Sequence, residues 1–502
     1  MKNALWSPAI VRQVPLLFVI FYVLYSYEIN NFDLSLDDER HAFSDGDFIP
    51  LGRWLIPAIK YTLWPQLVVP HAPYLIFGLL ISLAYCVTLG LARVEKLELF
   101  HYACFGVLVS FPVVAAQLEF SAHIIALGIS FLAAAVAVFF TIDAQSHAGI
   151  RYWARMLYAV LLCTVAAGAY QSAILNYFVI LLPLIAQKSL LQDKADYRGA
   201  FGLTAIGLAV LVVATLLYSL ISWSLIKLTG MPAAKEYLAS SYLGEHPSLF
   251  EFIYDRIFYF LQAMYRVFYA MWYNYGLAKY VFAFSILFCV ATVLAPFLRS
   301  PLRLLLLAAA LTATLMAPGA LILVSGQQMP IRVFVAASTA LMMLFLLAYQ
   351  RADSPLVRNA ITVLTVLFVT QSMYILSAQR AATWVTQRHD VLMAGALNRD
   401  ILAAVDTPAD QEIRVDFHGS ATTQSVIPGI ATTMSPASFF AWDYGNPFRM
   451  VKFMNLMGFH RYESIPDSER APLKPEYADA AIWPHPGSIK VVDGVVLVRL
   501  SE

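Results

Sequence analysis

Long apolar runs without charge constrain this chain more than any other feature. Residues 202–226 hold no charged side chain, and residues 113–142 hold a single acid, Glu119. A helix of about 20 apolar residues is long enough to cross a bilayer. Only 13% of the 502 residues are charged, whereas about 25% is usual in a soluble domain. The chain is therefore expected to be a polytopic membrane protein, not a soluble multidomain enzyme, a disordered chain, a fibrous protein or a disulfide-rich secreted module.

Charge and cysteine usage exclude further classes. The net charge of +1 offers no basic footprint for nucleic acid. No histidine or cysteine has the spacing of a zinc site. The first apolar stretch, residues 14–27, has no A-x-A cleavage site after it, so it is expected to be an uncleaved span. Each of the four cysteines lies in an apolar stretch and is expected to be buried or lipid-facing: Cys86, Cys104, Cys163 and Cys289.

Hydropathy predicts a polytopic α-helical fold with about eleven transmembrane helices. Their approximate limits are 11–29, 72–92, 97–116, 122–142, 153–170, 172–188, 201–226, 278–297, 302–324, 331–349 and 356–377.

Basic residues in short loops mark the cytoplasmic side of a membrane protein. The connections near Ser121 and Gln171 hold no Lys or Arg. The N-terminus is therefore expected in the cytoplasm, and an odd number of spans places the C-terminus outside. The basic connections hold Arg93, Lys96, Arg151, Arg155, Lys188, Lys194, Arg198, Arg299, Arg303, Arg351 and Arg358.

Three segments on the outer side do not fit simple spans: residues 28–71, residues 227–279 and everything after about 377. The aromatic stretch 253–276 has polar residues at helical spacing, which favours a helix in the interface plane; a re-entrant hairpin or two short spans are the alternatives. A second interfacial stretch is expected after the first outer acids. Its aromatic residues would lie at headgroup level: Trp54, Tyr61 and Trp64.

The tail changes character near residue 400. Residues 412–419 alternate like a strand, and residues 488–500 are typical of a hairpin with Asp493-Gly494 as its turn. Residues 446–459 between them predict a helix capped by Asn446. We therefore expect a transmembrane region over 1–400 and a small periplasmic α/β domain over 401–502.

An acidic segment follows the first span directly. Residues 30–41 read N-N-F-D-L-S-L-D-D-E-R-H. A solvated outer loop would explain such charges without any function. However, interface-seeking aromatics flank the segment, so it is expected near the bilayer surface. Carboxylates there could act as a general base on a sugar hydroxyl or hold a divalent cation, although no metal is required. The charged residues are Asp33, Asp37, Asp38, Glu39, Arg40 and His41.

Short motifs in this layout resemble a known family. Many-span proteins with acids in the first outer loop resemble the GT-C glycosyltransferases. More narrowly, Asp37-Asp38-Glu39-Arg40, then Gly52-Arg53-Trp54-Leu55, then Ala169-Tyr170-Gln171 at the end of the fifth span resemble the Gtr-type serotype-converting glucosyltransferases. The resemblance covers most of the chain, including residues 483–500 at its end.

The resemblance implies a reaction and a location. Members decorate the O-antigen of bacterial lipopolysaccharide, so the implied donor is undecaprenyl-phosphate glucose and the implied acceptor is a lipid-linked glycan. Transfer would take place on the periplasmic face of the bacterial inner membrane, with inversion at the anomeric carbon. No cofactor is implied beyond an optional divalent cation.

Site roles follow from that resemblance. Asp37 or Asp38 would deprotonate the acceptor hydroxyl, and spacing leaves the choice open. Arg53 would bind the donor phosphate, because a guanidinium matches phosphate oxygens. Arg332 is the second choice for the phosphate, with an interfacial anchor as its alternative. Further substrate-binding candidates are Asp33, Glu39, Arg40, Trp54, Glu119, His123, Tyr170, Gln171 and Gln327.

Structural roles compete with several of these assignments. Glu119 and His123 flank a short turn, and polar residues such as Tyr170 and Gln171 often cap spans. Trp442, Asp443 and Tyr444 suit contact with a sugar, with a folded core corner as the alternative.

Other functions remain as rivals. A GT-C transferase for another sugar or acceptor is the nearest, and a glycan polymerase would act at the same face. A lipid-linked glycan flippase or transporter would place ionisable groups inside its spans. Here the centres of most spans carry none. A non-catalytic membrane scaffold would leave the outer acids unexplained.

Overall fold

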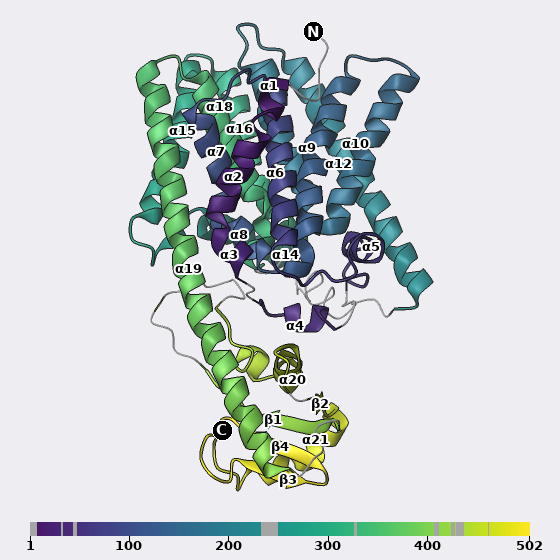
Figure 1. The fold of residues 1–502 in the computed structure, drawn as a ribbon. Helices are drawn as coiled ribbons and strands as arrows, with labels where there is room; N and C mark the ends of the chain where they lie inside the picture. Colours follow the sequence, from purple (N-terminus) through teal and green to yellow (C-terminus); the bar gives the residue numbers. More distant parts are fainter. Residues whose placement is uncertain are drawn as a thin grey trace. The chain divides into compact units, whose positions relative to one another are not determined.

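A computed structural model describes residues 8–31, 34–43, 48–231, 249–325, 329–405, 411–422, 427, 436–459 and 461–502. The chain forms two compact units. The helical unit comprises Met1–Phe32 and Asp47–Leu376, and the sheet unit comprises Asp33–Gly46 and Ser377–Glu502 (Figure 1).

The helical unit is built from α-helices, many of them long and apolar. Its α-helices are α1 (Pro8–Val11), α2 (Val14–Leu24), α3 (Ser26–Asn30), α5 (Leu55–Thr62), α6 (Ala72–Leu91), α7 (Leu99–Ser110), α8 (Pro112–Leu118), α9 (Ile124–Ala144), α10 (Ile150–Ala169), α11 (Leu175–Ile185), α12 (Tyr197–Thr229), α14 (Leu249–Phe268), α15 (Ala278–Leu294), α16 (Pro301–Met316), α17 (Ala320–Ser325), α18 (Ala336–Arg351) and the first part of α19 (Pro355–Ala404).

The helices identify a multi-pass membrane protein. Within the described ranges, nine helices are long and apolar enough to cross a bilayer. The pair α7 and α8, bent by 49°, adds a tenth. The bend falls at Pro112, which lacks the N–H that a continuous helix would need. The first predicted span corresponds to a shorter apolar helix, Ala9–Leu24, so the length criterion gives nine or ten spans where hydropathy predicts about eleven.

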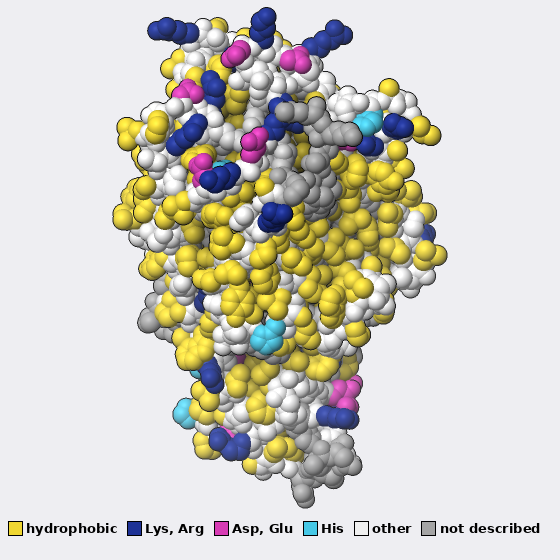
Figure 2. Space-filling model, turned by 45° about the horizontal axis from the view of Figure 1, so that its top comes forward, with side chains coloured by type: hydrophobic (Ala, Val, Ile, Leu, Met, Phe, Trp, Pro, Cys, Tyr) yellow, Lys and Arg dark blue, Asp and Glu magenta, His cyan; other side chains and the backbone are white. Residues whose placement is uncertain are grey.

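The core of the helical unit depends on close helix contacts. Helix α18 is buried on nearly every side from Ala336 to Ala348, as expected for a helix that is apolar all round. Between α9 and α6, a Cβ on Gly128 would lie only 3.2 Å from the Phe77 Cα. The small residue therefore allows two backbones to approach closely, which is how membrane helices gain packing energy without a hydrophobic effect between them. Hydrophobic side chains cover the flank of the helical unit in Figure 2, and Lys and Arg gather at the end turned toward the viewer.

The sheet unit has a four-stranded mixed sheet with the order β2-β1-β4-β3. The strands are β1 (Ile413–His418), β2 (Tyr462–Ser464), β3 (Ile489–Val492) and β4 (Val495–Arg499). Strand β1 pairs in parallel with β2 and β4, and β3 pairs antiparallel with β4. Its helices are α4 (Asp38–His41), the second part of α19, α20 (Pro447–Leu456) and α21 (Asp467–Leu473).

The turn, helix and strand predicted in the tail are confirmed. Asp493 and Gly494 both have positive φ, 50° and 78°, and turn β3 into β4 as predicted. Helix α20 begins at Pro447, and the Asn446 side chain accepts a hydrogen bond from the Phe448 N–H at 3.0 Å. The predicted strand around residues 412–419 is β1.

Two features of the sheet unit differ from the sequence expectation. The last predicted span ends at 377, but α19 continues without a break to Ala404. The residues beyond 377 are largely Ala, Gln, Arg and Leu, which are strong helix formers, and no proline interrupts them. The compact unit also includes residues 33–46 from the N-terminal acidic segment, besides the tail expected from about 401.

A buried carboxylate in α19 gives a test of this unit. Asp390 is fully buried and accepts hydrogen bonds from Ser438 Oγ at 2.6 Å and the Phe439 N–H at 2.8 Å. Asp390→Ala should destabilise the protein by about 1–3 kcal/mol, because a buried backbone donor loses its partner. The measurement is the apparent melting temperature of the purified full-length protein. Arg399→Ala is the matched control, because its side chain is 76% exposed in the same helix; equal melting of the two variants would contradict the assignment.

Candidate active site

The acidic segment folds into a tight turn followed by the single helical turn α4. Asp37 adopts a left-handed conformation with φ 84°, which is uncommon for a non-glycine residue. Its carbonyl accepts hydrogen bonds from the N–H groups of Arg40 and His41, both at 3.0 Å. The Asp38 side chain accepts from the Ser35 N–H at 3.1 Å and is fully buried. Asp38 therefore stabilises the turn, whereas 24% of the Asp37 side chain is exposed.

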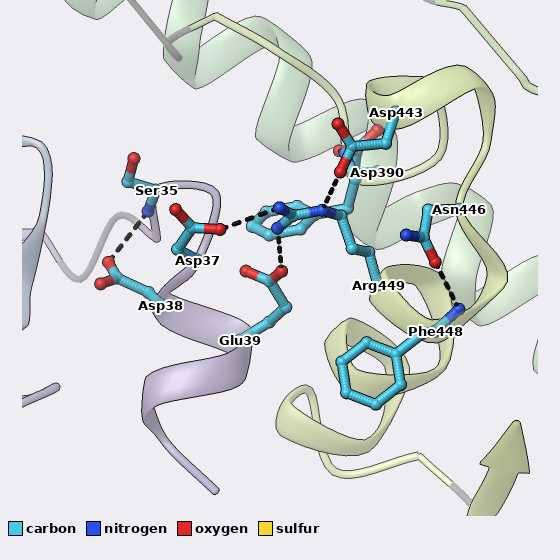
Figure 3. A network of polar contacts seen from close by, with 10 residues as sticks. Ser35, Asp37, Asp38, Glu39, Asp390, Asp443, Asn446, Phe448 and Arg449 are labelled. Atoms are coloured by element: carbon cyan, nitrogen blue, oxygen red, sulfur yellow. Dashed lines mark hydrogen bonds and ion pairs between the residues drawn. The ribbon is translucent and has the colours of Figure 1, made fainter. Parts of the chain in front are cut away.

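Arg449 collects the carboxylates of this segment. Its guanidinium donates to Asp37 Oδ1 at 2.9 Å and to Glu39 Oε1 at 2.5 Å. Its Nε donates to Asp443 Oδ2 at 2.7 Å. Figure 3 shows the three carboxylates converging on the guanidinium: Asp37 from the turn before α4, Glu39 from α4 and Asp443 from the chain before α20. One arginine in α20 therefore binds acids that lie more than 400 positions away in the sequence.

Burial dominates the electrostatics of this cluster. Glu39 is fully buried, and burial raises its pKa; the charge of Asp37 raises it further, and Arg449 offsets this only in part. Burial alone would lower the pKa of Arg449, but the charges of Asp37 and Glu39 outweigh this and raise it above the ordinary value. Within the described part of the chain, Glu39 Oε2 is buried without a hydrogen-bond partner. Strained and incompletely paired charges of this kind gather at functional sites.

Sequence reasoning missed Arg449. It predicted the helix but assigned the arginine no role. The sequence signal for Arg449 was local. Arg449 lies in the predicted helix next to the apolar residues Met450 and Val451, and the structure buries all three. A cation at a buried helix position needs an anionic partner, but nothing in the spacing indicates which acids supply it.

The helical unit brings together four other predicted residues. The Arg53 guanidinium lies 4.9 Å from the ring centroid of Tyr170. Gln171 donates to the Leu51 carbonyl and to the Tyr218 hydroxyl, the latter at 2.9 Å. Trp54 packs on Gly168, where an added Cβ would meet the indole at 2.3 Å.

This cluster contains donors without partners. Among the described residues, Arg53 Nε and Trp54 Nε1 are buried and make no hydrogen bond. These two donors belong to adjacent residues and lie near the Gln171 amide and the Tyr170 phenol. Such a group suits an anionic or hydroxyl-rich ligand. We name this group, Arg53, Trp54, Tyr170 and Gln171, the Arg53 cluster.

Three further candidates, Arg332, His123 and Glu119, lie around Phe120. The Arg332 guanidinium lies 5.0 Å from the Phe120 ring centroid, and His123 stacks on the same ring at 5.4 Å. Glu119 caps the end of α8. Asp33 and Gln327 lie outside the described residues. In the described ranges, no group of three or more His, Cys, Asp or Glu side chains is arranged to hold a metal ion.

Arg449 and its three carboxylate partners, Asp37, Glu39 and Asp443, are named the Arg449 cluster. A groove of about 700 Å³ opens beside this cluster in the sheet unit. Arg40 and Asp443 line it, together with residues from the start of α20 and from the segment that leads into α21. Arg40 belongs to the same helical turn as Glu39, and Asp443 binds Arg449 directly.

These features define a multi-pass membrane protein with a buried carboxylate–arginine cluster. The family model described as glucosyl transferase GtrII matches residues 26–349, well over half of the chain, so the chain belongs to that family. It is a membrane glucosyltransferase, and the resemblance drawn from its short motifs is confirmed. No curated protein and no solved structure matches it. The match includes the acidic segment and the Arg53 cluster, and it ends before Arg449.

Replacing Arg449 tests the cluster. Arg449→Met should destabilise the protein by roughly 3–5 kcal/mol, because breaking a buried ion pair leaves its partners as unpaired charges. The loss should shrink as the pH falls from neutral toward the raised pKa of Glu39, because Arg449 lowers this pKa in the wild type and Glu39 without Arg449 therefore takes up its proton at a higher pH, which removes the unpaired charge.

Apparent melting temperatures across that pH range provide the measurement. The double variant Arg449→Met with Glu39→Gln should recover part of the loss at neutral pH. Arg399→Met, which changes an exposed arginine of the same unit, serves as the control. If Arg449→Met had the same apparent melting temperature as the wild type at neutral pH, the cluster would not stabilise the sheet unit.

Proposed function

We propose that this glucosyltransferase moves glucose from undecaprenyl-phosphate glucose to a lipid-linked O-antigen glycan. Transfer takes place at the periplasmic face of the bacterial inner membrane, in a GT-C-type architecture with its N-terminus in the cytoplasm. The observation that carries the proposal is the carboxylate cluster around Arg449, in a member of a glucosyl transferase family. The acids lie in the segment that the basic-loop pattern assigns to the outer side.

The reaction requires a base and a displaced phosphate. The base takes the proton from an acceptor hydroxyl, whose oxygen attacks the anomeric carbon. A bond forms between that oxygen and the carbon, while the bond from the carbon to the phosphate oxygen breaks. Undecaprenyl phosphate leaves with the electron pair. A single displacement of this kind inverts the anomeric configuration.

The geometry favours Asp37 over Asp38 as the base. Asp38 is fully buried and bound within its own turn. The Asp37 side chain is partly exposed and forms an ion pair with the guanidinium of Arg449. That guanidinium binds Asp37 through a single oxygen, Oδ1. A carboxylate held in one orientation by such a contact suits proton abstraction.

The Arg53 cluster is the proposed site for the donor phosphate. Arg53 supplies a positive charge and a buried Nε donor, and Trp54 supplies the indole N–H. Both would gain a partner from phosphate oxygens, which would remove the cost of leaving buried donors unpaired. Gln171 and Tyr170 adjoin them.

A transporter or flippase is the rival from another class. Labelled polyprenyl-phosphate glucose in vesicles separates the two: transfer yields glucosylated glycan, whereas translocation moves the intact donor across the bilayer. Growth of the glycan chain would indicate a polymerase.

Asp37 and Asp38 give the first test of the proposal. Asp37→Asn should lower the rate of glucosyl transfer by about 10²–10⁴-fold, the usual contribution of a general base. Asparagine keeps an acceptor for Arg449, so expression and melting should remain near wild type. Asp38→Asn should retain transfer. Asp493→Asn, in the β3–β4 turn where asparagine tolerates positive φ, is the control. Full activity of Asp37→Asn would remove the assignment, and loss of activity in Asp38→Asn alone would move the base to Asp38.

Arg53 gives the second test. Arg53→Ala should weaken donor binding by about 10–100-fold, the effect of losing a charged hydrogen bond. Binding of labelled undecaprenyl-phosphate glucose to the purified protein measures this. Arg299→Ala, an exposed arginine in a basic loop of the same unit, should bind the donor like wild type. Unchanged binding by Arg53→Ala would move the phosphate site elsewhere.

A further inference from the structure

The groove beside the Arg449 cluster has a wall of unusual backbone. Asp443, Tyr444 and Gly445 adopt positive φ one after another, at 50°, 58° and 81°. Such conformations are strained for residues with side chains and persist only when their surroundings enforce them. Here the Arg449 ion pair fixes Asp443, and the Trp442 carbonyl accepts from the Gly445 N–H at 3.0 Å.

This turn places an aromatic ring in solvent. Tyr444 lines the groove and is 98% exposed. The neighbouring Phe448, at the start of α20, lines the same groove and is 43% exposed. Large aromatic side chains normally lose surface on folding, so two of them open to one groove indicate a ligand that stacks on their faces. The C–H face of a pyranose ring is such a ligand.

The polar groups of the groove are mixed in sign. Arg40 and Arg470 contribute positive charge, and Asp443 and Asp467 contribute negative charge. Arg470 is already bound to Asp416 at 2.7 Å, and Asp443 is bound to Arg449. A balanced, internally paired set of charges disfavours a strongly anionic ligand such as free phosphate. The carboxylate and guanidinium groups of the groove can still accept hydrogen bonds from, and donate them to, the hydroxyl groups of a sugar.

Size and position agree with a glycan. The volume of about 700 Å³ lies within the usual range for ligand pockets, roughly 300–1,000 Å³. Asp443 joins the groove to the cluster that contains Asp37, because both carboxylates bind Arg449. A glycan in the groove would therefore lie next to the proposed base.

We infer that this groove is the acceptor site and binds a short, uncharged stretch of oligosaccharide, with Tyr444 stacking on a sugar ring. The inference rests on the proposed function and adds the residues that hold the acceptor. None of them except Arg40 lies in the part of the chain that the family model matches.

The test measures glycan binding separately from transfer. The probe is O-polysaccharide released from the lipopolysaccharide of the host by mild acid and labelled with a fluorophore, titrated against the purified full-length protein. Tyr444→Ala should raise the apparent Kd by about tenfold, the effect of losing one stacking contact. Tyr444→Phe, which keeps the ring, should bind within about twofold of wild type. Val491→Ala changes an exposed residue of β3 outside the groove and serves as the control.

The outcomes separate this inference from the proposed function. If the wild type transfers glucose but Tyr444→Ala binds the polysaccharide normally, the acceptor site is not here, although the function stands. If binding falls in Tyr444→Ala while no glucose is transferred, the groove binds glycan and the proposed reaction fails. Absence of wild-type binding, or displacement of the probe by inorganic phosphate, overturns the inference.

Discussion

The contact between Arg449 and three carboxylates is the interaction on which the sheet unit depends. Asp37 and Glu39 lie two positions apart and would repel each other when removed from water. Glu39 is fully buried, and burial of an unpaired carboxylate is expensive. The guanidinium makes that burial tolerable because it donates to both acids and to Asp443. It thereby binds the N-terminal acidic segment to the C-terminal part of the chain.

The same arginine organises the surface around it. Helix α20 holds Arg449 in its first turn, and the Asn446 cap fixes where that helix begins. The ion pair with Asp443 in turn secures a strained left-handed turn, and that turn presents Tyr444 to the groove. A single cation therefore links the proposed base, the turn and the groove.

Much of this architecture is predictable from local pattern. The long apolar runs indicate the membrane helices, and the Asp493-Gly494 dipeptide indicates the β3–β4 hairpin. The extension of α19 to Ala404 was missed because a span is recognised by hydropathy, whereas the helix beyond residue 377 depends on helix-forming residues and on the packing of Ala394, Leu397 and Ile401 in the sheet unit. The candidate residues Arg53, Tyr170 and Gln171 were named separately, and the structure groups them. Arg449 was missed because two of its three partners, Asp37 and Glu39, are distant in sequence.

The sequence by itself determined the class of protein, its family motifs and the elements that arise from hydropathy and turn chemistry, since these depend on neighbouring residues. Only the tertiary structure decided which acid is buried, which is partly exposed and which cation neutralises them. Those properties depend on desolvation and on distances of a few ångströms between segments. For Asp37 and Arg449, more than 400 positions apart, no sequence period carries that information.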